Sequence, residues 1–371
     1  MSAGSAVVER WTPQSRIAVA TAAIIIALLA VGPAIFSANA VDKLTTLFIY
    51  VILALMWNAL VGFCGLVSIG QQAFFGLGAY AAIRLADLGV SVYPSLFLGA
   101  LIVGALSWPL SLLMLRLKGG EFAIGMWVVS ELAHLLVNLD TLVRGETGTS
   151  LIELNAYAND SRRALTYWCA LGAMAGLLAI VFRLLRSPLG AAIQAIRDNE
   201  EAAESIGVRV MSAKRLVFTL AAFGAALAGA LWVATALTFQ PKAYFSPLWT
   251  AYMIFMALVG GLGTFEGAIL GAIIFFAIET WFGDMGVWYL VGLGATALIF
   301  ALLFPRGIWG WIEDRTSLRL LPVGYRLRFA TQDQEVRGAE SSHEGQGGSR
   351  NASGEDDRHH RNFVRHRRAR R

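Results

Sequence analysis

Long apolar stretches recur along most of the chain, and they limit its fold more than any other feature. A run of about 20 apolar residues can cross the hydrocarbon core of a bilayer as a helix, where a helix or a closed barrel satisfies every backbone hydrogen bond. The sequence therefore predicts an all-α, polytopic membrane helix bundle of about ten transmembrane spans. The predicted spans are 17–36, 45–63, 71–86, 95–115, 122–139, 164–182, 216–238, 248–262, 267–281 and 287–304.

The composition supports this class and divides the chain into three regions. Hydrophobic residues make up 57% and charged residues 15% of the 371 residues, with a mean hydropathy of +0.61. We predict a cytoplasmic N-terminus (1–16), a transmembrane domain (17–311) and a disordered, basic C-terminal tail (312–371). The tail is too polar to form a core, and its arginines favour contact with anionic membrane lipid. Ala38-Asn39-Ala40 leaves open a signal-peptidase cleavage, although the preceding run exceeds the roughly 7 to 15 residues of a signal core.

The distribution of Lys and Arg predicts the orientation, because short cytoplasmic loops carry the positive excess. Threading ten spans places both termini and the polar segment 185–214 on the more basic, cytoplasmic side. It places 140–163 outside, as the longest external segment. We therefore expect a multi-pass membrane protein with both termini in the cytoplasm.

The polar segment 185–214 interrupts the apolar pattern and predicts two short helices with an elbow between them. Ser187 before Pro188 is typical of a helix start. Asp198 or Asn199 offers a second cap, with Glu201 placed as in a capping box that begins at Asp198. Gly207 is suited to a left-handed helix stop.

The same segment shows an apolar stripe at helical spacing, which predicts one packed side and one side offered to a partner. An ordinary amphipathic surface hairpin between two spans is the alternative. We expect Leu189, Ile193, Ile196, Ala203 and Ile206 to pack inward, and Gln194, Arg197, Asp198, Glu201 and Glu204 to point outward.

Four residues of this segment, Glu201, Ala202, Ala203 and Gly207, match the E-A-A-x-x-x-G core of the loop by which ABC importer permeases engage their ATPases. The surrounding S-P-L-G-A-A-I-Q-A-I-R-D-N-E-E-A-A-E-S-I-G-V resembles the branched-chain amino acid ABC transporter permease family, particularly its LivM-type subunit. The resemblance extends over roughly 51–311. The segment departs from the general importer motif because it lacks the I-x-L-P ending.

The resemblance implies a permease subunit that imports branched-chain or related hydrophobic amino acids; urea and short amides are alternative substrates. It implies a second, LivH-type permease, two cytoplasmic ATP-binding subunits and an extracytoplasmic solute-binding protein. ATP would bind to those partner subunits, so no cofactor is expected here. The residues implied in ATPase coupling are Gly190, Arg197, Asp198, Asn199, Glu200, Glu201, Ala202, Ala203 and Gly207.

A second informative stretch, 65–80, is rich in glycine and carries Ser68, Gln71 and Gln72 at membrane depth. Polar groups left unpaired in hydrocarbon are costly, so we expect this backbone to pack against protein or a watery path. The stretch is similar to the family's S-x-G-Q-x-A-F-F-G-x-G-A-Y signature. For Gly76 and Gly78 we favour close packing, whereas the three polar side chains could either line a path or pack.

In addition to Arg84, three acidic or histidine residues fall within predicted spans. Glu131 and His134 are three residues apart and so share a helix face, and Glu279 lies in a later span. Such residues usually face the bundle interior. They are candidates for the translocation path, or they pair with each other and with a neighbouring helix.

Several functional classes lack support in the sequence. We find no phosphate-binding Walker loop, H-E-x-x-H motif, nucleophile elbow or Cys/His cluster, so we expect neither an enzyme nor a metal site. Of the 30 Lys and Arg, 13 follow Trp311, as do 9 of the 25 Asp and Glu. The body is thus nearly neutral, and no nucleic-acid partner is expected. A secondary transporter or channel for a small polar solute, using Glu131, His134 and Glu279, is the alternative function.

Overall fold

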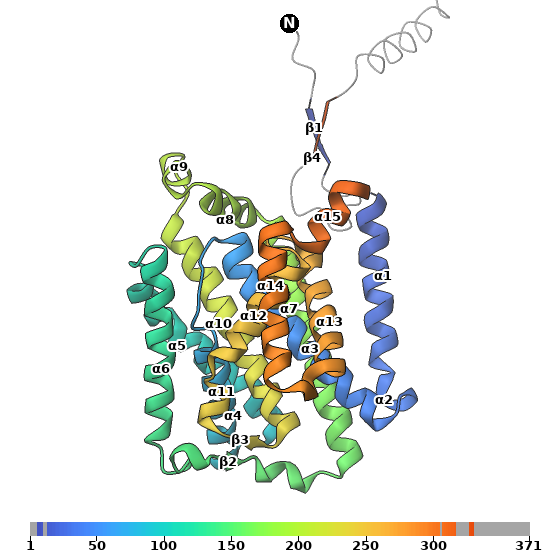
Figure 1. Cartoon of the computed structure of the whole chain (residues 1–371), viewed down its shortest axis with the longest axis vertical. Helices are drawn as coiled ribbons and strands as arrows, with labels where there is room; N and C mark the ends of the chain where they lie inside the picture. The colour runs from blue at the N-terminus through green and yellow to red at the C-terminus, as the bar shows by residue number, and fades with distance from the viewer. Residues whose placement is uncertain (1–5, 10–12, 305, 317–325, 330–371) are drawn as a thin grey trace, which may run out of the picture. The chain divides into compact units, whose positions relative to one another are not determined.

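The computed structural model describes residues 6–9, 13–304, 306–316 and 326–329. The chain divides into two compact units, one of Met1–Arg10 and Tyr325–Arg371 and the other of Trp11–Gly324. In the first unit, β1 (Ala6–Glu9) pairs antiparallel with β4 (Arg326–Phe329). The second unit contains the helices (Figure 1).

The helices of the second unit follow one another with short connections. In chain order they are α1 (Pro13–Ala30), α2 (Gly32–Ile35), α3 (Ala38–Asn58) with the π-helical turn η1 (Ala59–Phe63), α4 (Gln72–Asp87), α5 (Val92–Met114), α6 (Gly120–Asn138), α7 (Asn159–Arg186), α8 (Pro188–Asp198), α9 (Glu200–Ser205), α10 (Val210–Ala236), α11 (Pro241–Tyr244), α12 (Pro247–Gly260), α13 (Phe265–Phe282), α14 (Val287–Leu303) and α15 (Gly307–Thr316). Short elements in the connections are η2 (Gly145–Thr147), η3 (Ile152–Ala156), η4 (Gly283–Met285), and β2 (Thr149–Ser150), which pairs antiparallel with β3 (Thr238–Phe239).

Within the described residues, eight helical stretches are long and apolar enough to cross a membrane. They are Ala38–Phe63, Val92–Met114, Gly120–Asn138, Asn159–Arg186, Val210–Ala236, Pro241–Gly260, Phe265–Met285 and Val287–Arg315. The other two predicted spans, 17–36 and 71–86, coincide with α1 and α4. Both are shorter than the eight stretches above: the apolar part of α1 is Arg16–Ala30, and α4 has 16 residues. The all-α, polytopic prediction is confirmed, and the chain is a multi-pass membrane protein.

α4 is short because the chain before it is extended rather than helical. Between residues 65 and 71, Leu66, Ser68 and Gly70 are buried, whereas Val67 and Ile69 are about half exposed. This alternation is that of a strand-like backbone. A side chain at Gly70 would overlap the carbonyl oxygen of Met126 on α6. The prediction that this backbone packs against protein is therefore confirmed.

The core forms around α10, which packs against α3, α4, α5 and α7. Small residues let these helices approach closely, as is common in membrane bundles. A Cβ at Gly78 of α4 would overlap the carbonyl oxygen of Ala226 on α10, and one at Gly229 of α10 would overlap that of Phe75. A Cβ at Gly76 would lie 2.7 Å from the ring of Phe245. Close packing, favoured for Gly76 and Gly78, is confirmed.

α8 and α9 lie at one end of the bundle, and the β2–β3 pair lies at the opposite end (Figure 1). α15 runs on to Thr316, past the predicted start of the tail at residue 312. Residues 317–325 and 330–371 of the predicted tail lie outside the described residues, as do 1–5 and 10–12 of the predicted N-terminus. For those residues the two predictions stay predictions.

Candidate functional site

The segment 185–214 folds into the two predicted helices, α8 and α9, which meet at Asn199. Ser187 caps α8: its Oγ accepts a hydrogen bond from the Gly190 N–H at 3.4 Å and donates to the Leu184 carbonyl at 2.6 Å. Asn199 caps α9 by accepting from the Ala202 N–H at 3.0 Å. The predicted capping box of Asp198 and Glu201 is wrong, because Asp198 accepts hydrogen bonds from Arg197 instead.

Gly207 ends the helix pair in the predicted left-handed conformation, with φ of +87°. Its N–H donates to the Glu204 carbonyl at 2.9 Å, and the Val208 N–H donates to the Ala203 carbonyl at 3.1 Å. These bonds satisfy carbonyls at the end of α9. A Cβ at this position would meet no atom within 4 Å, so the requirement for glycine is conformational rather than steric.

The inward side of the loop is narrower than the predicted apolar stripe. Ile193, Ile196 and Ala203 are buried, whereas Leu189 is 47% and Ile206 77% exposed. The prediction for Ile206 is wrong because the bend at Asn199 gives the two helices different directions, so the stripe does not continue along one axis. The prediction for Leu189 is also wrong, although this residue lies in the first turn of α8, before the bend. Gly190 provides the contact with α7: a Cβ there would overlap the Leu185 carbonyl oxygen.

The outward side is formed mainly by α9. Glu201, Ala202 and Glu204 are exposed, and the exposed Ile206 follows them. Ala203 does not belong to this side, because only 2% of it is accessible. This burial agrees with the predicted inward position of Ala203, whose small side chain fits the packing within the chain. Its implied role in ATPase coupling stays a prediction.

Two polar contacts hold the loop against the membrane domain. Arg197 Nη1 donates to the Gly62 carbonyl at 2.9 Å, a bond that joins α8 to η1. Lys214 Nζ of α10 lies 2.6 Å from Glu200 Oε2 at the start of α9. Arg197 is exposed, as predicted, but its guanidinium also bridges Asp198 and the membrane domain, which the sequence analysis did not predict.

Arg197 is one member of a junction that also contains Asn58, Gly62, Gly263 and Thr264, which we term the Arg197 junction. Asn58 is fully buried at the end of α3. Its Nδ2 donates to the Thr264 carbonyl at 2.8 Å, and its Oδ1 accepts from the Gly263 N–H at 2.9 Å. The junction therefore connects α8 to α3 and to the turn between α12 and α13.

The glycines of this junction leave room for its backbone contacts. A Cβ at Gly62 would overlap Asn58 Oδ1, and Gly263 adopts φ of +74°. The sequence-based analysis missed Asn58 and Gly62. A lone asparagine in the apolar run Leu53–Leu60 was the one available signal, since a buried amide in such a run needs hydrogen-bond partners.

Among the path candidates, Ser68, Gln71 and Gln72 lie in the interior, each at most 1% exposed. Ser68 Oγ accepts from the Gly70 N–H at 3.3 Å, and Gln72 Oε1 accepts a short hydrogen bond from Thr250 of α12. Both side-chain polar atoms of Gln71 are buried without a protein partner. Ser68 and Gln72 thus take part in packing, although Gln72 Nε2, like both polar atoms of Gln71, is buried without a protein hydrogen-bond partner.

Glu131 and His134 of α6 form a cluster with the loop that follows. His134 Nδ1 lies 3.3 Å from Glu131 Oε1, and His134 Nε2 lies 2.9 Å from Glu146 Oε1. Glu146 also accepts from Asn138 Nδ2 at 2.7 Å and from the Lys242 N–H at 3.0 Å. Burial raises the pKa of Glu146, but these hydrogen bonds and His134 outweigh burial and leave that pKa below its ordinary value.

Glu279 of α13 is separate from this cluster. Its Oε1 accepts from the buried Tyr50 hydroxyl of α3 at 2.8 Å. Within the described residues, no hydrogen bond or ion pair joins Glu279 to Glu131 or His134. The structure therefore brings together the predicted coupling residues of α8 and α9 but places the predicted path residues in three separate regions, where a role in translocation stays a prediction.

The fold and the loop define a class of protein: a polytopic membrane helix bundle with a two-helix loop at one end. Residues 39–304 match the model of the family described as "Branched-chain amino acid transport system / permease component". This match covers most of the chain, which therefore belongs to that family. The resemblance noted in the sequence, including its LivM-type character, is confirmed.

Similar proteins of known name support the assignment. The chain is 28% identical over 322 residues to the high-affinity branched-chain amino acid transport system permease protein LivM of Escherichia coli, with 80% of this chain and 76% of that protein covered. It is 28% identical over 314 residues to the protein of the same name from Salmonella typhimurium, covering 77% and 74%. It is 25% identical over 294 residues to BraD of Pseudomonas aeruginosa, covering 73% and 94%.

Proposed function

We propose that the chain is the membrane permease subunit of an ABC importer that moves branched-chain or related hydrophobic amino acids into the cell. Two cytoplasmic ATP-binding subunits would supply the energy, and this chain would catalyse no reaction itself. The observation that carries the proposal is the structure of the α8–α9 loop. It is fixed to the membrane domain through Arg197 and Lys214, yet it presents Glu201, Ala202 and Glu204 to a partner.

The contacts of the loop suggest how ATP binding would be transmitted. Closure of the ATPase dimer would displace α9, which is linked to α10 through Glu200 and Lys214. It would also displace α8, whose Arg197 holds the Gly62 carbonyl. Because the Arg197 junction includes Thr264, the displacement would reach α3 and the α12–α13 turn together. Rigid-body movement of packed helices is an established form of such a transition.

A second permease of the LivH type is supported by the surface of α6. Its outer face is apolar but includes Glu131, whose side chain is 60% exposed. A charged residue facing lipid at the middle of a span is unfavourable by about 3 kcal/mol, so this face fits a protein neighbour or an aqueous path better than lipid. The apolar residues around Glu131 on this face are Ile124, Trp127, Val128, Leu132, Leu135 and Leu136.

A solute-binding protein would contact the opposite end of the bundle, and this orientation can be tested by labelling. A cysteine introduced at Asn155, beside the β2–β3 end, should react with an impermeant thiol reagent in cells whose outer barrier is opened. A cysteine at Gln194 of α8 should react only after the plasma membrane is permeabilised. If the cysteine at Gln194 reacts in cells with only the outer barrier opened and the one at Asn155 does not, the orientation is the opposite one and α8 and α9 are not in the cytoplasm. The native Cys64 and Cys169 are first replaced by serine.

Gly207 provides a second prediction about the loop. Gly207→Val places a β-branched residue at φ of +87°, a strain of about 1 kcal/mol or more, and should distort the end of α9. We expect normal membrane insertion and retention of the second permease, with ATPase association or stimulated hydrolysis reduced. Gly207→Asn is the matched control, because asparagine tolerates left-handed backbone better than valine. Equal activity of the two variants would contradict a role for this conformation.

The substrate is inferred from the relatives in Escherichia coli and Salmonella typhimurium, whose names specify branched-chain amino acids. Urea and short amides remain the alternative within the importer proposal. Uptake of labelled leucine in the presence of excess isoleucine, valine, urea or acetamide separates these possibilities. We expect isoleucine and valine to reduce leucine uptake. If only urea or acetamide reduces it, the transported substrate is a short amide and not a branched-chain amino acid.

The proposal as a whole is tested by purification of the tagged chain from its native membrane. We expect two ATP-binding subunits and a second permease to co-purify in stoichiometric amounts. Loss of the ATP-binding subunits alone in an Ala202→Trp variant would place the contact on the exposed side of α9. If the wild-type chain purifies without any ATP-binding subunit under conditions that keep the membrane complex intact, the proposal fails.

A further inference from the structure

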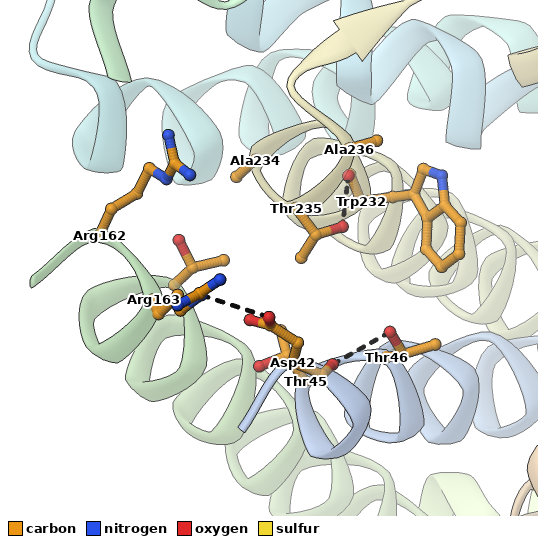
Figure 2. A pocket seen from close by; sticks show the side chains of 10 residues that line it. Asp42, Thr45, Thr46, Arg162, Arg163, Trp232, Ala234, Thr235 and Ala236 are labelled. Atoms are coloured by element: carbon orange, nitrogen blue, oxygen red, sulfur yellow. Dashed lines mark hydrogen bonds and ion pairs between the residues drawn. The ribbon is translucent and has the colours of Figure 1, made fainter. Parts of the chain in front are cut away.

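A cavity of about 380 Å³ opens at the end of the bundle opposite α8 and α9, between the first turns of α3 and α7 and the end of α10 (Figure 2). Its volume lies near the lower end of the range for small-molecule sites. Two of its lining residues, Thr45 and Thr166, are at most 4% exposed, so the cavity has a buried base. The lining residues are Asp42, Thr45, Thr46, Arg162, Arg163, Thr166, Trp232, Ala234, Thr235 and Ala236.

The charges of this cavity leave one guanidinium unpaired. Arg163 Nε lies 3.3 Å from Asp42 Oδ2, and Arg163 Nη1 lies 4.0 Å from Asp160. The side chain of Arg162 has no hydrogen bond or ion pair with any described residue, and it extends apart from the Arg163–Asp42 pair (Figure 2). Asp42, Arg162 and Arg163 are the ionisable residues of the lining. Their net charge of one positive unit favours a carboxylate, which a guanidinium binds with paired hydrogen bonds.

Three of the four threonine hydroxyl groups of the lining act as acceptors toward the cavity. Thr45 Oγ1 donates to the Val41 carbonyl at 2.8 Å, Thr46 Oγ1 to the Asp42 carbonyl at 3.2 Å, and Thr235 Oγ1 to the Trp232 carbonyl at 2.7 Å. Because each hydroxyl has a single proton, its oxygen can then only accept from a ligand. Together with the Asp42 carboxylate, these oxygens suit an ammonium group.

The remaining part of the wall is apolar. Trp232, Ala234 and Ala236 come from the last turns of α10, and Trp232 also stacks on Tyr50 with ring centroids 6.0 Å apart. The cavity therefore combines a donor for a carboxylate, acceptors for an ammonium and a surface for an aliphatic side chain. These are the three groups that an α-amino acid carries.

We propose that this cavity binds a small aliphatic α-amino acid as a zwitterion, with its carboxylate on Arg162 and its ammonium group near Asp42 and the threonine hydroxyls. The inference rests on the proposed function, which places this end of the bundle outside the cell. It adds a binding site within the permease itself, at the outer entrance, for the amino acid that the solute-binding protein releases.

The Arg162 guanidinium could instead bind a carboxylate side chain of the solute-binding protein. The test therefore separates the two sources of the carboxylate, a free amino acid and the solute-binding protein. The full-length chain is purified with its second permease and ATP-binding subunits, placed in nanodiscs and titrated with radiolabelled leucine without the solute-binding protein. We expect saturable binding that isoleucine and valine displace. Isoamylamine, which lacks the carboxylate, should not displace leucine, and isovalerate, which lacks the ammonium group, should displace it only weakly.

Variants assign the binding to the cavity. Arg162→Gln should weaken leucine binding about tenfold or more, and Arg162→Lys should have an intermediate effect. Arg209→Gln, at the opposite end of the bundle, is the control and should bind as the wild type does. Each variant is accepted only if it elutes as the intact complex, which distinguishes loss of the site from loss of the fold.

Three results would overturn the inference. The first is no saturable leucine binding up to about 10 mM, and the second is an unchanged affinity for leucine in Arg162→Gln. The third is that Arg162→Gln weakens only the association with the solute-binding protein. The proposed function would fail in a different way. It would fail if the wild-type complex contained no ATP-binding subunits, whereas leucine binding is measured here without ATP hydrolysis.

Discussion

Gly78→Ala should destabilise the membrane domain by about 3 kcal/mol, although it adds only one methyl group. The new Cβ would overlap the carbonyl oxygen of Ala226, which is backbone and cannot rotate away. α4 would have to separate from α10, the helix around which the core forms. We expect a large fall in the amount of monodisperse protein and in its midpoint of thermal unfolding in detergent, measured by fluorescence-detected size exclusion after heating.

Gly172→Ala in α7 is the matched control, since a Cβ at that glycine would meet no atom within 4 Å. Alanine in a helix interior is favoured over glycine by roughly 0.5–1 kcal/mol, so this variant should be as stable as the wild type or slightly more stable. If both variants unfold at the wild-type temperature, the close approach of α4 and α10 is not a feature of the folded protein.

Arg197→Gln should leave the complex assembled but reduce ATP-driven uptake at least about tenfold. The substitution removes the donor to the Gly62 carbonyl, a charged hydrogen bond of the kind that contributes about 1.5–3 kcal/mol. α8 would then move without carrying η1 and the α12–α13 turn with it. We expect ATP hydrolysis to continue at or above its wild-type rate while transport falls, measured as the ratio of substrate moved to ATP hydrolysed.

Arg209→Gln changes another arginine of the same loop, one that is exposed and has no hydrogen bond or ion pair with a described residue. It should keep the wild-type ratio of transport to hydrolysis. A second comparison is Asn58→Leu, which removes the bonds to Gly263 and Thr264 while leaving the loop sequence intact. If both Arg197→Gln and Asn58→Leu keep the wild-type ratio of transport to hydrolysis, the Arg197 junction does not couple the loop to the membrane domain.

The features that sequence analysis predicted correctly depend on local chemistry. Ser187 before Pro188 and Gly207 at a helix end act within three or four residues, so the positions of α8 and α9 follow from the segment alone. The spans follow in the same way, because each is a continuous apolar run. Gly78 was predicted to pack closely because glycine at membrane depth has few other uses.

The errors concern contacts between distant parts of the chain. The bond of Arg197 to the Gly62 carbonyl was missed, because the two residues are 135 apart in sequence. The predicted apolar stripe assumed that one straight helix continues as far as Ile206. The chain instead bends at Asn199, and the Ile206 side chain is exposed.

The contact between Glu131 and His134 follows from their spacing. The bonds of His134 to Glu146 and of Glu279 to Tyr50 were instead set by tertiary packing, which no local pattern contains.

The central claim, that this chain is the permease of an ATP-driven importer, is tested most directly by uptake in proteoliposomes. The purified complex is reconstituted with the solute-binding protein outside and ATP inside, and labelled leucine uptake is measured with and without a proton uncoupler. We expect uptake that requires internal ATP, stops when the ATP-binding subunits carry a substitution that blocks hydrolysis, and persists with the uncoupler. Uptake that needs no ATP and collapses with the uncoupler would instead identify a secondary transporter.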